Sequence, residues 1–168
     1  VSFPRTVRQV PIFYKHKNTG RPEGFYESVF ITKYLDSPNQ PLFPFGYGLS
    51  YTTFGYSEIQ MEDKQLTRDG KLNVSVKVKN TGKYKGTETV QLYIRDLVAS
   101  VTRPVKELKS FRKVELKPGE EKKVEFVITE KDLRFWNDKK QFISEPGKFH
   151  LFIGTDSENV KKTEFVLL

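Results

Sequence analysis

The chain has 168 residues, of which 36% are hydrophobic and 30% are charged, and its formal net charge is +8. No apolar run approaches the roughly 18 residues that a membrane-spanning helix needs, so the sequence predicts no membrane insertion. The absence of cysteine excludes disulfides, thiolate nucleophiles and sulfur-ligated metals. The 29 basic residues are interspersed with 21 acidic ones along the chain, as on solvated strand faces, so we expect no nucleic-acid partner.

The first 53 residues show no sustained period. Residues 7–14 are predicted to form one buried strand, whereas residues 15–40 contain Gly, Pro, Asn and Ser without a regular pattern. A structureless stretch of more than about 20 residues is unusual inside a compact domain. Because the sequence also begins at Val1 rather than at an initiator methionine, we expect a processed chain or a fragment in which residues 1–40 are the end of something larger.

From about Phe54 onward, apolar and polar residues alternate with the period of half-buried strands. Runs of this kind predict an all-β fold, an antiparallel sandwich of seven strands over residues 54–168 whose two sheets bury their apolar faces against each other. The alternation predicts that eight side chains face inward: Leu72, Val74, Val76, Leu92, Ile94, Phe126, Leu151 and Ile153.

Turn residues separate these runs. Asp69 and Gly70 predict a tight hairpin with a positive φ at the glycine. The Pro-Gly pairs at 118–119 and 146–147 predict type II turns. Each of these turns would reverse the chain, as an antiparallel sandwich requires.

Several polar residues are candidates for chemistry, and a structural interpretation is favoured for each. Asp36, Asp96, Asp132 and Asp138 are interpreted as turn or surface carboxylates, because the sequence pairs none of them with a second carboxyl at catalytic distance. We therefore name no catalytic residue in this chain. The sequence likewise predicts no metal site.

His150 and Trp136 lie in the strand-rich part of the chain. His150 stands between Phe149 and Leu151, so its side chain is predicted to point to the outer face of that strand. Its distance in sequence from His16 leaves no metal-ligand motif. Trp136 is predicted to be a core or interface anchor, with a sugar-stacking platform as the alternative.

Residues 41–54 form an aromatic segment with the sequence PLFPFGYGLSYTTF. Its prolines restrict the backbone, its glycines allow a sharp reversal, and its rings can fill a groove between layers. The two glycines do not form a dinucleotide-binding fingerprint, because no third glycine opens a helix after a strand. We expect interdomain contacts from seven residues: Phe43, Phe45, Gly46, Tyr47, Gly48, Leu49 and Tyr51.

This segment resembles the stretch that leads out of the α/β-sandwich domain of family 3 glycoside hydrolases of the β-glucosidase type. The sequences FPRTV at 3–7 and IFYKHKNTGRP at 12–22 are similar to the closing strand and following loop of that domain. Further matches, to the appended fibronectin type III-like domain, are GTETVQLYIRD at 86–96, SVTRPVKEL at 100–108 and LKPGE at 116–120. The resemblance implies three parts: an α/β-sandwich remnant at 1–40, a linker at 41–53 and a fibronectin type III-like domain at 54–168.

The resemblance also implies a function for the parent chain. Family members hydrolyse terminal β-linked glucosyl residues by a retaining mechanism, with an Asp nucleophile and a Glu acid/base that lie upstream of the matching region. The 168 residues alone are therefore expected to be inactive and to need no cofactor. Their expected partners are the upstream catalytic domains, and oligosaccharide is reached through the parent only. The parent is expected to be bacterial and periplasmic or secreted, with His16, Lys17 and Arg21 as candidates for the rim of its active site.

Two alternatives remain open. Within the family, the parent is a β-xylosidase or an α-arabinofuranosidase. Outside it, the sandwich is a stand-alone module that binds carbohydrate or another protein, since a fold of this kind does not determine function. In addition, the unpaired edge of the 7–14 strand and the exposed linker rings predict a homodimer of the isolated chain.

Overall fold

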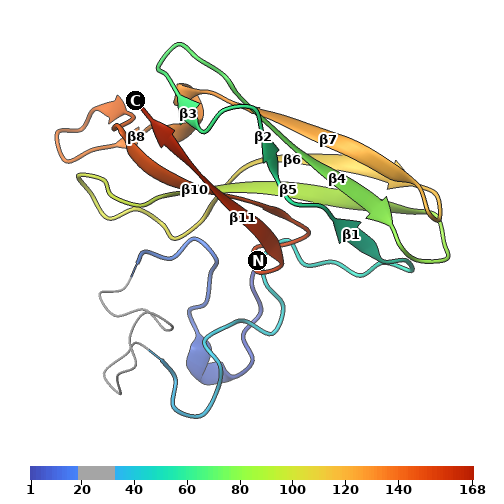
Figure 1. Cartoon of the computed structure of the whole chain (residues 1–168). Helices are drawn as coiled ribbons and strands as arrows, with labels where there is room; N and C mark the ends of the chain where they lie inside the picture. The colour runs from blue at the N-terminus through green and yellow to red at the C-terminus, as the bar shows by residue number, and fades with distance from the viewer. Residues whose placement is uncertain (19–32) are drawn as a thin grey trace.

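The computed structural model describes residues 1–18 and 33–168, which are almost entirely strands, turns and loops (Figure 1). Within these ranges, no helix is long and apolar enough to cross a membrane. The elements are η1 (Val7–Gln9), β1 (Phe54–Tyr56), β2 (Gln60–Met61), β3 (Gln65–Leu66), β4 (Leu72–Asn80), β5 (Gly86–Asp96), β6 (Glu107–Leu116), β7 (Glu121–Ile128), η2 (Glu130–Leu133), β8 (Phe135–Trp136), β9 (Phe142–Ile143), β10 (Gly147–Gly154) and β11 (Val160–Leu167).

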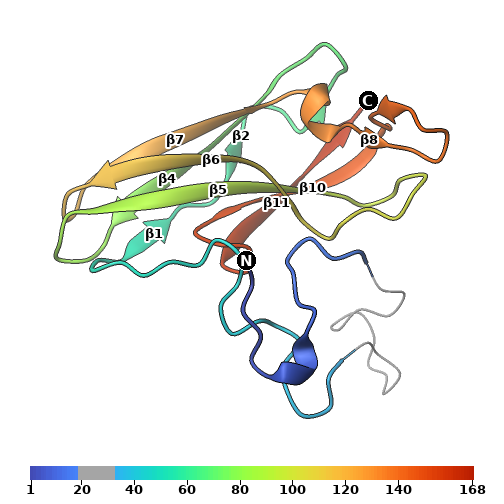
Figure 2. The same cartoon turned by 180° about the vertical axis from the view of Figure 1, so that it is seen from behind.

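Two sheets face each other (Figures 1 and 2). In the four-stranded sheet, β7 pairs with one edge of β4, and β1 and β2 share the other edge. Between β1 and β2 the side chain of Ser57 replaces the ladder, because Lys77 N donates to Ser57 Oγ at 3.0 Å and Ser57 N donates to Lys77 O at 3.0 Å. The five-stranded sheet has the order β3-β11-β10-β5-β6 and is antiparallel except for the pairing of β3 with β11. A separate hairpin is formed by β8 and β9.

The core lies between the sheets and confirms the prediction of an all-β sandwich. Each of the eight side chains predicted to face inward is at most 3% exposed. Phe149 of β10 and Phe165 of β11 stack in this core with ring centroids 5.3 Å apart. The two sheets together contain nine strands among the described residues, rather than seven. Three of the nine, β1, β2 and β3, are two or three residues long, too short to show an alternation.

Only one of the three predicted glycine turns has the expected backbone. Gly119 has a φ of +76°, as a type II turn requires. Gly70 does not have a positive φ, because its loop joins β3 to β4 in the opposite sheet and makes no tight hairpin. Gly147 does not have a positive φ either, since it already belongs to the extended strand β10.

The predicted strand at residues 7–14 is absent; the first three residues of this range form η1 instead. Val7 is 89% exposed, whereas Gln9 is fully buried. The Gln9 side chain accepts a hydrogen bond from Arg5 N at 2.6 Å and donates one to Pro38 O at 2.6 Å. A buried amide therefore organises this segment through side-chain contacts that a strand ladder would not allow.

The side chains of His150 and Trp136 both lie on the outside of the strand-rich part. His150 lies on the outer face of β10, as predicted, where its Nε2 is 3.0 Å from Glu164 Oε1. Trp136 is 66% exposed, so it is not a core anchor, and the interface and sugar-stacking interpretations stay predictions. In the short strand β8, alternation turns Phe135 into the protein and therefore turns Trp136 out to solvent.

Candidate domain interface

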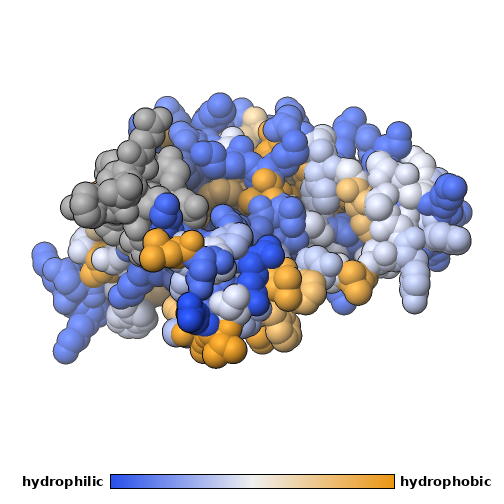
Figure 3. All heavy atoms as spheres, turned by 90° about the horizontal axis from the view of Figure 1, so that it is seen from below, coloured by the Kyte–Doolittle hydropathy of each residue, from blue (hydrophilic) through white to orange (hydrophobic). Residues whose placement is uncertain are grey.

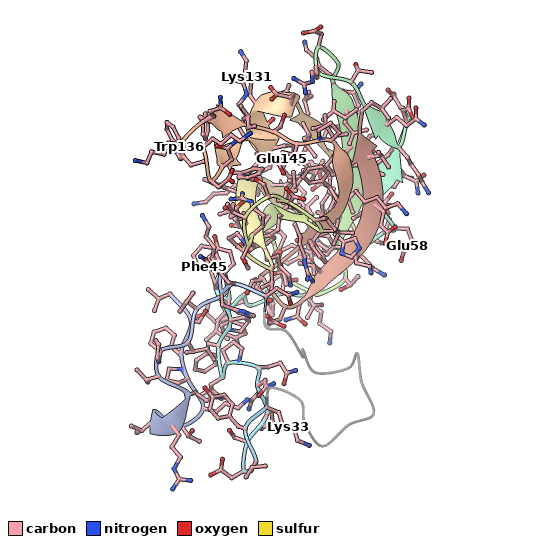
Figure 4. All side chains as sticks on the ribbon, turned by 90° about the vertical axis from the view of Figure 1, so that its left-hand side faces the viewer. Lys33, Phe45, Glu58, Lys131, Trp136 and Glu145 are labelled. Carbon is pink, nitrogen blue, oxygen red and sulfur yellow. The ribbon has the colours of Figure 1, made fainter. Side chains whose placement is uncertain are left out.

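An aromatic stack joins the N-terminal segment, here residues 1–18 and 33–53, to the five-stranded sheet. The rings of Tyr14 and Phe45 are parallel, with centroids 4.2 Å apart, and the edge of Tyr14 meets Tyr93 at 5.8 Å. Tyr93 belongs to β5 and is fully buried although it points to the outer face of its sheet. Figure 4 shows Phe45 at the junction between the N-terminal segment and the sandwich. The stack therefore covers an aromatic side chain that would otherwise face water.

Polar contacts hold the linker in register beside this stack. The buried side chain of Gln91 accepts a 2.6 Å hydrogen bond from the hydroxyl of Tyr93, and its Nε2 donates to Gly46 O at 3.2 Å. The amide of Ser157 donates to Phe45 O at 2.9 Å. Burial is the main cause that raises the pKa of Tyr93 above its ordinary value, so this hydroxyl remains a donor across the physiological range.

The backbone at Gly46 lies so close to the Gln91 side chain that only glycine fits this position. Its φ of +85° lies in the left-handed region, and a Cβ atom there would lie 2.2 Å from Gln91 Oε1. Any other residue would strain the backbone and displace the amide that binds it. A Cβ atom at Gly48 would meet no neighbour within 4 Å, so the structure gives no comparable reason for that glycine.

A second contact joins residues 14–17 to the loop between β5 and β6. Val105 N donates to His16 O at 2.9 Å, and Lys17 forms an isolated bridge with Pro104. Lys15 Nζ lies 2.8 Å from Glu107 Oε1. Burial opposes the ionisation of Glu107, but Lys15, Lys109 and Arg103 outweigh it and lower its pKa.

A cavity of about 570 Å³ lies between the two parts. Phe13, Tyr14, Tyr34 and His16 line it on the side of the N-terminal segment, and Lys106 lines it on the side of the sandwich. Burial lowers the pKa of Lys106, whose Nζ donates to Ser157 O and lies 5.0 Å from the centre of the Phe152 ring. The ammonium group of Lys106 is thus held in one wall of the cavity by the Ser157 carbonyl and the face of the Phe152 ring.

Four large apolar side chains are exposed on the outer side of the N-terminal segment: Phe3, Leu42, Phe43 and Tyr47. We call these four residues the apolar cluster. Phe3 N donates to Phe43 O at 2.9 Å, and their rings meet edge to face at 6.2 Å. The Phe43 and Tyr47 rings lie 5.0 Å apart. Figure 3 views the molecule from this side and shows several apolar patches on it.

The structure separates the predicted linker residues into two groups. Phe45 and Gly46 contact the sandwich directly, whereas the side chains of Phe43, Tyr47, Leu49 and Tyr51 are exposed.

Of the predicted rim residues, His16 and Lys17 bind the β5–β6 loop through their backbones and have exposed side chains. Arg21 lies outside the described residues. The sequence analysis did not identify Gln91, Tyr93 or Lys106 as contact residues. A large aromatic residue at an outward position of a strand, as at Tyr93, is the signal that could have indicated a covered face.

Comparison with known proteins extends beyond the sandwich. Residues 88–157 match the fibronectin type III-like domain family. The whole chain is 50% identical to a periplasmic beta-glucosidase of Salmonella typhimurium and covers 22% of that protein. Over 99% of its length it is 44% identical to a putative beta-xylosidase of Formosa agariphila, of which it covers 21%. A crystal structure of a beta-glucosidase from Listeria innocua in complex with isofagomine matches 99% of this chain with 42% identity and a TM-score of 0.90, and this chain covers 23% of it.

Over nearly its whole length the chain is therefore similar to beta-glucosidases of glycoside hydrolase family 3. It spans about a fifth of the length of the relatives it matches and corresponds to the C-terminal part of family 3 enzymes. The family resemblance drawn from the aromatic segment is therefore confirmed. Because the match includes residues on both sides of the Tyr14–Phe45 stack, the similarity covers the N-terminal segment as well as the sandwich.

Proposed function

We propose that this chain is the non-catalytic C-terminal part of an enzyme that hydrolyses terminal β-linked glucosyl residues with retention, and that it supports the upstream catalytic domains. The observation that carries this proposal is the apolar cluster on the outer side of the N-terminal segment. Since the relatives are several times longer than this chain, the cluster is the surface on which the remainder of the protein docks.

The proposed division of labour follows the contacts. Residues 1–40 are the end of the preceding α/β-sandwich domain, residues 41–53 are the linker, and residues 54–168 are the fibronectin type III-like domain. In support, the linker faces both ways: Phe45 contacts Tyr14 and the sandwich, whereas Phe43 and Tyr47 are exposed on the other side.

The glucosyl substrate is favoured by the names of three relatives, in Salmonella, Bacteroides and Acetivibrio, that are beta-glucosidases. A β-xylosidase is the second candidate, because the Formosa relative has that name at 44% identity. The upstream catalytic domains would decide between the two sugars. In the parent, the exposed side chains of His16 and Lys17, together with Arg21, would lie at the rim of the active site.

A bacterial, periplasmic or secreted location is proposed from the name of the Salmonella relative, a periplasmic enzyme. The interface between the N-terminal segment and the sandwich contains no disulfide, as the chain has no cysteine. Its hydrogen bonds and aromatic stack consequently do not depend on the redox state of the compartment.

Activity assays on two proteins test the proposed role. The full-length parent should hydrolyse an aryl β-glucoside faster than an aryl β-xyloside, and residues 1–168 alone should hydrolyse neither. Activity of the 168 residues above a buffer control, abolished by mutation of one of their own carboxylates, would contradict a non-catalytic role. A preference of the parent for the xyloside would instead favour the second candidate.

A stability measurement tests the docking surface. Phe43→Ser with Tyr47→Ser should lower the Tm of the full-length parent by several degrees and leave the Tm of residues 1–168 nearly unchanged. Val127→Ser on the outer face of β7 is the matched control, since Val127 is also about half exposed. Equal effects of both changes on the parent would argue against docking at the apolar cluster.

The isolated chain should also associate. Its predicted edge strand at residues 7–14 does not form, so the proposed homodimer depends on the apolar cluster alone. Light scattering should show a dimer of residues 1–168, and deletion of residues 1–40 should change the association state while the sandwich stays folded. A strictly monomeric full chain, or unfolding on truncation, would refute this part of the proposal.

A further inference from the structure

One end of the sandwich carries most of the net positive charge of the chain. Residues 77–87 and 112–123 contain nine basic and three acidic residues, which gives +6 of the net +8. Pairing of β4 with β7 and of β5 with β6 brings these two segments together at the end opposite the β8–β9 hairpin (Figure 1). We call this surface the basic end. Basic residues that are interspersed with acidic ones along the sequence therefore give a net positive charge at one end of the folded sandwich.

Asn80 fixes the two loops of the basic end to each other. Its buried side chain donates from Nδ2 to Tyr84 O at 2.8 Å and to Leu116 O at 3.0 Å, and its Oδ1 accepts from Gly82 N at 3.0 Å. Gly119 N donates to Asn80 O at 2.9 Å. The loops at 81–85 and 117–120 thus present their side chains from a common, hydrogen-bonded support.

The acidic residues of the basic end are already paired. Each of the three carboxylates lies within 3.4 Å of a lysine: Glu115 with Lys85, Glu120 with Lys122 and Glu121 with Lys77. Four exposed lysines form no ion pair with any described residue: Lys79, Lys83, Lys113 and Lys117. The surface therefore has an excess of uncompensated ammonium groups and attracts anions.

An exposed ring lies among these charges. Tyr84 is 65% exposed and stands between Lys83 and Lys85 in the loop at 81–85. The negative face of an aromatic ring attracts the C–H groups of a pyranose, and the flanking ammonium groups attract carboxylates. Both contacts together fit a sugar that carries an acid.

We propose that the basic end binds an acidic polysaccharide of the polyuronide type. Duplex DNA, with a charge every ~1.7 Å, suits a denser cationic surface than four uncompensated lysines interrupted by ion pairs. A bilayer would require a larger apolar element than one tyrosine. The basic end contains none of the residues of the apolar cluster, so this proposal does not depend on docking at that cluster.

Binding of polygalacturonate to residues 1–168, measured by calorimetry at 50 mM and 200 mM salt, tests this proposal. Affinity should fall as salt rises, since lysines release counterions from the polymer. Lys83→Glu with Lys113→Glu should weaken binding about tenfold or more. Lys131→Glu with Lys139→Glu, which makes the same change in net charge on exposed residues near η2 and the β8–β9 hairpin, should change it less than about twofold.

The contribution of the ring is separable from that of the charges. Tyr84→Ala should weaken binding severalfold and Tyr84→Phe should not, with circular dichroism melts as the check on folding. Neutral laminarin should not bind at the basic end. Equal losses for the two double lysine variants, no binding at 50 mM salt, or tighter binding to duplex DNA or to phosphatidylglycerol vesicles would each overturn the proposal.

Discussion

The ring of Tyr14 lies flat against that of Phe45, with centroids 4.2 Å apart and an angle of 18° between their planes. Neither residue belongs to a regular strand, yet together they cover Tyr93 on the outer face of β5. The contact attaches the N-terminal segment to the sandwich, and its strength can be measured in the isolated chain.

Phe45→Ala should detach the N-terminal segment from the sandwich. The loss should be about 2 kcal/mol, below the 3–5 kcal/mol of a fully buried Phe, because Phe45 is half-buried. Hydrogen exchange should then show about a thirtyfold rise in the opening of residues 14–17, while the core strands keep their protection. Tyr51→Ala is the control, since Tyr51 is almost fully exposed. Unchanged exchange in Phe45→Ala would show that the polar contacts alone hold the segment.

Asn80→Asp should destabilise the sandwich by about 3 kcal/mol. The change removes the donor of two hydrogen bonds and places a carboxylate against the carbonyl oxygens of Tyr84 and Leu116. Urea unfolding of residues 1–168 measures the difference. Asn73→Asp, on the exposed face of the same strand, should cost less than about 1 kcal/mol. Similar costs at both positions would refute the role given to Asn80.

Asp96 should make stability depend on pH. Burial raises its pKa to about 6, assisted by Glu145 and Glu107 and opposed by Val98 N and Arg103. Its Oδ2 is buried and has no hydrogen-bond partner among the residues that the structure describes. Because the folded pKa exceeds the unfolded value of 3.8, this group contributes stability that is full below about pH 4 and is lost as pH rises through 6.

Comparison of Asp96→Asn with the unmodified chain isolates this effect. The variant should lack the decline between about pH 4 and 6, and at pH 7 it should be the more stable of the two. Urea unfolding at intervals from pH 4 to 8 gives both curves. Carboxylates with lowered pKa that are not coupled to Asp96, such as Glu130, contribute the opposite slope in both proteins and cancel in the difference. Parallel curves would contradict the raised pKa of Asp96.

Tyr56→Phe should destabilise the core although it removes a single oxygen. The Tyr56 hydroxyl donates a 2.6 Å hydrogen bond to Glu88, which is buried between the sheets on β5. Without this donor the carboxyl of Glu88 loses its partner, at a cost of about 1–3 kcal/mol by urea unfolding. The double variant with Glu88→Leu should recover part of this loss. If it does not, the hydrogen bond is not the cause.

The core of the sandwich could be predicted from sequence because alternation directly encodes which face is buried. Leu72 and Ile153, distant in the sequence, are both inward-facing for this reason. β8 has only two residues, too few to show an alternation, so the sequence did not indicate that Phe135 is buried and Trp136 exposed.

The N-terminal segment could not be predicted in the same way. Its buried residue is the polar Gln9, whose amide contacts the distant Pro38, while the apolar Val7 is exposed. Contacts between side chains and a remote backbone leave no period in the sequence. At Tyr93 the outward-pointing ring indicates a covered face, but strand alternation does not show which segment covers it.

Ser57 has a consequence for how this protein behaves at high concentration. By standing in for the ladder between β1 and β2, it leaves the outer boundary of the four-stranded sheet in pieces of three and two residues. A strand from another molecule needs a longer continuous row of backbone groups to add to a sheet. The interrupted edge at Ser57 is therefore a poor template for a strand from another molecule.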